Sequence, residues 1–208
     1  MRRFKLLGLA LPLAGIIVLL ASLLAGGASG GSDNAKMRWD IIHLSNLPAP
    51  GATTLPGGNA SACTASSCAN MITLTGSGTF RSNPGRPQDV TGGGTWTTSG
   101  FGAGSGTYEV TGFVSFVLAP GNLPSPPFSD GVTGVAADAR AGLAVLRIAY
   151  SDGDEGVLVI SCDLPGTPAS LPIFEGVTAS KGFVDYWSRV ASESVAPFGN
   201  RTAFHVLG

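Results

Sequence analysis

Three short segments share the pattern Gly-x-Gly-Thr-aromatic: GSGTF at 76–80, GGGTW at 92–96 and GSGTY at 104–108. Threonine and aromatic residues favour β-strands, and glycine allows the backbone to bend or bulge where a sheet turns a corner. The second glycines of the three patterns are separated by sixteen and then twelve residues. Strands at such intervals predict an antiparallel meander whose neighbours are joined by hairpins.

Further strands are predicted on the C-terminal side of this meander. Residues 107–118 alternate well, with Tyr108, Val110, Gly112, Val114, Phe116 and Leu118 on the face expected to be core. Residues 143–150 and 156–162 flank a turn containing Asp152-Gly153, which predicts a hairpin. Residues 173–178 and 202–207 are expected to be closing strands. The only helical candidate is 182–193, where aromatic and apolar residues recur at helical spacing.

The sequence therefore predicts an all-β fold, a single antiparallel meander that closes into a barrel. Glycine and proline together make 45 of the 208 residues, because the chain has 31 Gly and 14 Pro, and this composition is typical of a turn-rich protein. We expect one domain at 32–208, with loops near 48–70 and 120–140. The proline-rich loops also suit the crossovers of a β-sandwich, which is the alternative fold.

Residues 1–31 have the features of an export segment. Three cations lie in the first five residues, and an uncharged apolar run follows from Leu6 to Ala25. That run is long enough to span a membrane, so we expect either a cleaved signal peptide or an N-terminal hydrophobic anchor helix. In both cases the domain that follows is secreted or otherwise extracytoplasmic, and it meets the membrane only through this segment if the segment is uncleaved.

The charge of the chain argues against anionic partners. The whole chain has 12 basic and 13 acidic residues. Without Arg2, Arg3 and Lys5 the exported part has nine bases against thirteen acids, a net charge of −4. No basic field is present to neutralise phosphates, so nucleic acid is not an expected partner.

The three cysteines fit an oxidising compartment. Cys63 and Cys68 lie five apart in a loop of small residues, and we expect them to form a disulfide. Cys162 shares one face of a predicted strand with Leu158 and Ile160, which indicates a buried, inert thiol. The cysteine spacing does not suit zinc, and the chain has only two histidines, so neither a metal nor a cofactor is expected.

Glu109 and Arg147 are the charged residues that stand out most, because each lies inside an otherwise apolar or threonine-rich strand. A charge within a sheet needs a partner or water to offset its desolvation. If both face the barrel lumen, they form a ligand pocket with Trp96 and Tyr108, an aromatic wall with a few polar groups. In the alternative interpretation the two charges face solvent and the aromatic residues fill the core.

Two function classes follow from this sequence. The first is a non-catalytic extracytoplasmic binding or surface module for a small or neutral ligand, and the chain is not expected to be an enzyme under this interpretation. The alternative is a secreted hydrolase or isomerase that uses carboxylate or histidine chemistry in a barrel pocket. Its groups would come from His43 and His205, four glutamates and nine aspartates, and the sequence alone cannot place any two at the separation that this chemistry needs; the glutamates are Glu109, Glu155, Glu175 and Glu193.

Overall fold

The structure is a computed structural model that describes residues 35–46, 51–82 and 89–208, and Ser32–Gly208 form one compact unit. The strands in chain order are β1 (Lys36–Ser45), β2 (Thr53–Pro56), β3 (Ala60–Cys63), β4 (Met71–Leu74), β5 (Ser77–Arg81), β6 (Val90–Ser99), β7 (Gly104–Ala119), β8 (Ser129–Asp130), β9 (Ala139–Tyr150), β10 (Glu155–Cys162), β11 (Gly176–Lys181), β12 (Val184–Tyr186), β13 (Ser188–Arg189) and β14 (Arg201–Leu207). One 3-10 turn, η1 (Ala136–Asp138), precedes β9.

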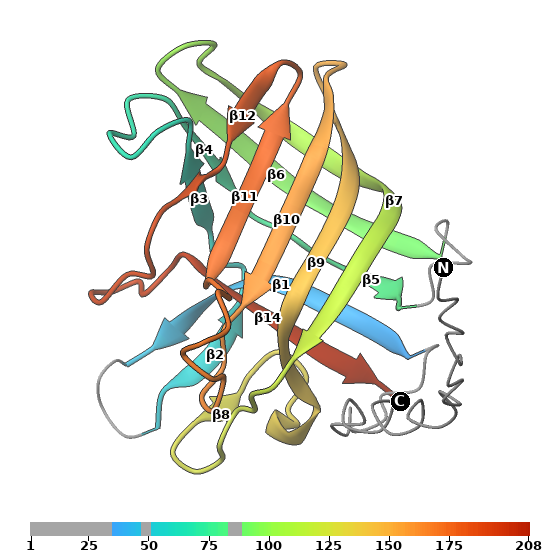
Figure 1. The fold of residues 1–208 in the computed structure, drawn as a ribbon, viewed down its shortest axis with the longest axis vertical. Helices are drawn as coiled ribbons and strands as arrows, with labels where there is room; N and C mark the ends of the chain where they lie inside the picture. Colours follow the sequence, from blue (N-terminus) through green and yellow to red (C-terminus); the bar gives the residue numbers. More distant parts are fainter. Residues whose placement is uncertain (1–34, 47–50, 83–88) are drawn as a thin grey trace, which may run out of the picture. The chain divides into compact units, whose positions relative to one another are not determined.

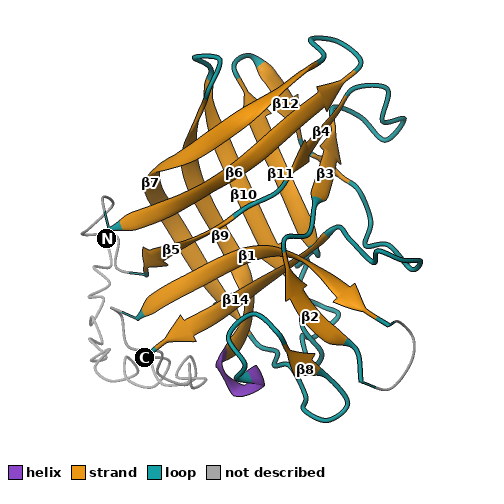
Figure 2. Ribbon diagram, turned by 180° about the vertical axis from the view of Figure 1, so that it is seen from behind, coloured by secondary structure: helices purple, strands orange, loops and turns teal. Residues whose placement is uncertain are grey.

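Six antiparallel strands close the barrel. The pairing runs β1-β5-β6-β7-β9-β14 and returns to β1. Strands β10, β11 and β12 continue outward from β9, while β4, β3 and β13 continue from β6. Figures 1 and 2 show the closed wall from two opposite sides. The predicted all-β barrel is confirmed, and the sandwich alternative is wrong.

The glycine-rich segments form β5, β6 and the start of β7, and they pair in sequence order as predicted. Gly78 on β5 lies opposite Gly92 on β6. A Cβ on Gly78 would lie 2.1 Å from the carbonyl oxygen of Thr91 and 2.8 Å from Nε1 of Trp39. Glycine is required here because the strands and the buried Trp39 indole approach too closely for any side chain.

The lumen is filled with side chains. The largest fully buried ones come from strands all around the wall: Trp39, Ile41, Ile72, Leu74, Phe80, Tyr108, Leu146, Ile148, Leu158, Ile160, Tyr186 and Phe204. Phe80 stacks on Phe113 at 5.1 Å between ring centroids and meets Phe204 edge-on at 6.2 Å. The middle of the barrel is therefore a packed core rather than a binding chamber.

Strand β7 differs from its predicted alternation. Two irregularities in its pairing with β9, between Val110 and Gly112 and between Phe113 and Ser115, each insert one extra residue. Each extra residue moves the following side chains to the other face. As a result Phe113 is buried in the core, whereas Val114, predicted to be core, is 44% exposed.

Three other predicted segments can be compared with the observed strands. The hairpin around Asp152-Gly153 is confirmed as β9 and β10. The helix predicted at 182–193 is wrong, because this segment forms β12 and β13, and Gly182 begins it with a φ of +57°. The stretch 48–70, expected as a loop, contains β2 and β3, which β1 and β4 hold in place by pairing.

The predicted export or anchor segment, residues 1–31, lies outside the described residues. Within the part of the chain that the structure describes, no helix is long and apolar enough to cross a membrane.

Candidate functional site

The structure separates the four residues expected to share a pocket. Trp96 and Tyr108 are buried in the lumen, at 4% and 2% exposure. Glu109 and Arg147 are exposed on the outer face of the wall. Strand alternation is the reason, since Tyr108 and Glu109 are adjacent, and Arg147 lies between the inward-facing Leu146 and Ile148. These four residues do not line a common pocket.

Trp96 does lie beside a charged group, but that group is Lys181. The Lys181 ammonium lies 4.5 Å from the centroid of the Trp96 ring and 5.2 Å from that of Tyr150. It donates hydrogen bonds to Asp152, at 2.5 Å, and to Asp154. The carboxylates of the β9–β10 turn therefore hold a lysine over the aromatic residues, and the chain itself occupies this end of the lumen.

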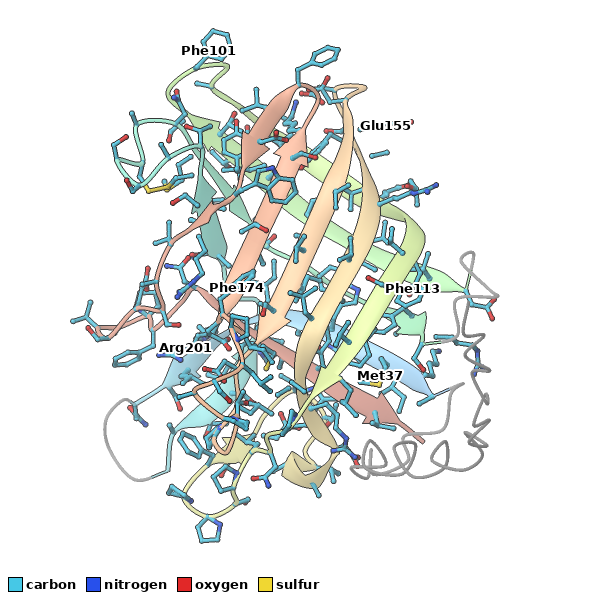
Figure 3. The ribbon with its side chains drawn as sticks, in the orientation of Figure 1. Met37, Phe101, Phe113, Glu155, Phe174 and Arg201 are labelled. Atoms are coloured by element: carbon cyan, nitrogen blue, oxygen red, sulfur yellow. A yellow bond between two sulfur atoms is a disulfide. The ribbon has the colours of Figure 1, made fainter. Side chains whose placement is uncertain are left out.

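A cavity of about 450 Å³ lies at the other end of the barrel. Figure 3 shows the two ends, with Phe101 and Glu155 at one and Phe174 and Arg201 toward the other. The walls of the cavity come from β1, β2, β14 and the loops that follow β7 and β10, and its lining residues are Ile42, Leu44, Thr54, Leu123, Phe128, Asp163, Leu164, Pro165, Gly166, Thr167, Glu175, Arg201 and Thr202. A site of this size is typical of small-molecule binding.

Glu175 is the most constrained polar group of the cavity. Its Oε2 accepts a hydrogen bond from the backbone N–H of Asp163 at 2.7 Å, and its Oε1 accepts one from that of Thr202 at 2.6 Å. Burial raises the pKa of Glu175 to about 8, although the two N–H donors and Arg201 act in the opposite direction. The carboxyl group therefore exchanges a proton near neutral pH and joins the ends of β10, β11 and β14.

Arg201 supplies hydrogen-bond donors to the same cavity. Its Nε is buried without a hydrogen-bond partner, and its Nη2 makes only a long 3.4 Å hydrogen bond to the carbonyl oxygen of Glu193. The Nη groups of Arg201 therefore retain donors that no side chain or backbone group satisfies with a short hydrogen bond.

Thr167, which lines the cavity, connects two of its loops by hydrogen bonding. Its hydroxyl lies 2.7 Å from the carbonyl oxygen of Pro120 and 2.8 Å from that of Leu164. The loops that follow β7 and β10 are therefore connected to each other beside the cavity, which favours a site formed before any ligand arrives.

A smaller cavity of about 20 Å³ adjoins the first and shares Ile42, Thr54, Leu123, Leu164 and Thr202 with it. His205 lines this inner space. Its side chain is fully buried, and neither ring nitrogen has a hydrogen-bond partner. Burial lowers the pKa of His205, against the opposing effect of Asp130 and Asp40, so the imidazole is neutral at neutral pH.

Asp130 and Asp40 both act electrostatically on His205. Asp130 Oδ1 lies 3.4 Å from Nε2 of His205. Burial acts to raise the pKa of Asp130, but hydrogen bonds from Thr133, Val132 and Thr54 outweigh it and hold that pKa below its usual value. Burial raises the pKa of Asp40, although Arg38 donates two hydrogen bonds of 2.7 Å to its carboxylate. The inner wall is thus a neutral imidazole among hydrogen-bonded carboxyl groups.

The cysteines agree with the sequence analysis. Cys63 and Cys68 form the expected disulfide. Cys162 is a free, fully buried thiol, and burial raises its pKa well above the usual value, which disfavours the reactive thiolate. Across the described residues no three His, Cys, Asp or Glu side chains gather as a metal site.

No protein-family model, curated protein or solved structure matches this chain.

The sequence analysis did not single out this site. Glu175 was one of four glutamates that the sequence assigned to no site. Arg201 directly precedes the strand predicted at 202–207, which was expected only to close the sheet. The available signal was the position of both charges, each within two residues of apolar residues of a strand, Val177 and Ala203. A charge at the end of a buried strand is held close to the core.

Proposed function

We propose that the domain at 32–208 is an extracytoplasmic binding module that holds a small neutral ligand in the cavity beside Glu175 and Arg201. The observation that carries the proposal is the cavity itself, about 450 Å³ with apolar walls and a few polar groups. This combination is the usual anatomy of a small-ligand site. The extracytoplasmic location rests on the apolar segment Leu6–Ala25.

The polar groups define the chemistry of the ligand. The walls contributed by Ile42, Leu44, Leu123 and Phe128 suit an apolar body. Arg201 lines the space and its Nη groups make only one long hydrogen bond, so the ligand carries a hydrogen-bond acceptor such as a carbonyl or hydroxyl oxygen. Asp163 lies beside the same space and offsets the positive charge of Arg201, which supports a neutral ligand over an anionic one.

A fluorescent probe tests this proposal. The probe 1-aminoanthracene is neutral and apolar, and its emission increases when it leaves water. We expect saturable binding to the wild type and at least tenfold weaker binding to Leu123→Trp, because Leu123 is 8% exposed and lines both cavities. Leu44→Trp is a second variant that fills the same space.

Phe101→Trp is the matched control, since Phe101 is 77% exposed at the opposite end of the barrel. Melting temperatures establish that each variant is folded. Failure of the wild type to bind the probe, or equal binding by folded Leu123→Trp, contradicts the proposal.

The unpaired nitrogens of His205 favour a second candidate, a hydrolase or isomerase with acid–base chemistry. A neutral imidazole beside a carboxylate is a suitable general base, and Glu175 titrates near neutral pH. The two candidates differ in the fate of the ligand. NMR of the ligand recovered from the protein and incubated with fresh protein shows no change for a binding module. For an enzyme it shows conversion that His205→Gln abolishes.

A further inference from the structure

The outer face of the wall formed by β7, β9 and β10 is apolar and uncovered. Outward-facing residues Leu143, Val145, Val157 and Val159 are only half-buried, and Val117 is 63% exposed. The first four belong to neither hydrophobic core cluster of the described residues. Figure 1 views the molecule onto this face, and no described segment crosses the middle of these strands.

Strand propensity does not explain this apolar surface. The outward positions of β6, on the same barrel, are Thr91, Thr95 and Thr97, all exposed. Threonine and valine have nearly the same shape and both favour strands, so either residue would form the wall. Valine in place of threonine on β9 and β10 therefore points to burial against something outside the barrel.

The charges on this face indicate what that partner is. Arg147 lies in register with Val157, and in the adjacent row of the sheet Ala149 lies in register with both Glu109 and Glu155. These three charged side chains are exposed. A patch that carries both signs beside an apolar strip is complementary to an identical patch related by a two-fold axis.

We infer that two copies of this chain associate through the outer faces of β7, β9 and β10. The interface packs Val145, Val159 and their neighbours against the partner copy, and Arg147 provides the positive charge that the acidic side chains of the partner require. Three strands over four rows give a flat footprint of roughly 400 Å². This is about half of what each partner buries in a standard interface, so we expect a dissociation constant in the micromolar range.

Sedimentation velocity of the exported protein between 1 and 200 μM tests this inference. We expect the weight-average mass of the wild type to rise from one chain to two. Val145→Lys stays monomeric over the whole range, because it places a charge in the apolar strip. Arg147→Glu also stays monomeric, since it makes the patch uniformly acidic, and adding Glu109→Arg to it restores at least part of the association.

Thr95→Lys is the matched control, an outward substitution on β6 that leaves the dimer intact. Melting temperatures equal to that of the wild type show that the variants are folded. A wild type that stays monomeric at 200 μM overturns the inference, as does a dimer that survives Val145→Lys and Arg147→Glu. Monomers that bind phosphatidylcholine vesicles through Val145 also overturn it, because the face would then contact lipid.

Discussion

Glu175 connects three parts of the chain that are far apart in sequence. One carboxyl group accepts hydrogen bonds from the backbone of Asp163, after β10, and of Thr202, in β14, while Glu175 itself directly precedes β11. Backbone N–H groups near a buried cavity need partners, and a carboxyl group can serve two of them at once. Glu175 therefore has a structural role beside any role toward a ligand.

Replacing Glu175 by Gln tests this role through its pH dependence. The pKa of Glu175 is about 8 in the folded protein against 4.5 as a free group. The folded state thus binds this proton more tightly, and the stabilisation is complete below pH 4.5 and is lost as the pH rises through 8. The amide of Gln can accept from only one of the two N–H groups, so at pH 5 we expect the variant to be about 1–3 kcal/mol less stable.

At pH 9 the wild type holds a negative charge at Glu175, so between pH 5 and 9 it should lose about 4 kcal/mol in the free energy of unfolding relative to Glu175→Gln, and the gap should close or reverse. Urea denaturation at intervals between pH 5 and 9 measures both free energies of unfolding. Taking the difference between the two proteins removes the contribution of His205 and other titrating groups. A gap that widens with pH contradicts the raised pKa.

At the scale of strands, the close approach of β5, β6 and β1 depends on missing side chains. Gly78→Ala would place a methyl group 2.1 Å from a backbone oxygen, where nothing flexible can move aside. We expect a loss of more than about 2 kcal/mol in the free energy of unfolding, measured by urea denaturation. Gly112→Ala on β7 is the control, because its Cβ would lie 3.5 Å from the nearest atom. Equal effects of the two changes would contradict a steric requirement at Gly78.

Local patterns predicted β5, β6, β7, β9 and β10 correctly. The glycine-threonine-aromatic repeats gave β5, β6 and β7, and the Asp-Gly turn gave the β9–β10 hairpin, because each depends on residues close together in sequence. The faces of β7 beyond Val110 were not predictable, since a bulge is set by pairing with β9. The segment 182–193 was predicted as a helix because its aromatic spacing fits the helical period, but pairing with β11 and β3 makes it two short strands.

The site was less predictable than the fold for a related reason. The predicted pocket required four side chains to face the lumen together: Glu109, Arg147, Trp96 and Tyr108. Strand alternation instead turns Glu109 and Arg147 to the outer face. The cavity instead combines loop residues near 123–128 and 163–167 with strand ends near 42–44 and 201–202. Residues this far apart in the sequence form no local pattern from which the cavity could have been predicted.

At the scale of the whole molecule, the middle and the two ends of the barrel have different structures. The middle of the lumen is packed, Lys181 and its carboxylates close one end, and the other end holds the cavity beside Glu175. A packed core gives the rigidity that a preformed cavity needs, so binding there requires little rearrangement of the wall. The outer face of β7, β9 and β10 is then free for association between copies.

Native mass spectrometry of the protein recovered from an exporting host tests the ligand-binding claim most directly. We predict an additional mass of a few hundred daltons, bound to the wild type and to Phe101→Trp and lost from Leu123→Trp. This bound species should be released on gentle activation as a neutral molecule. A wild type that carries no bound molecule, or a bound molecule that folded Leu123→Trp retains in full, would contradict the account.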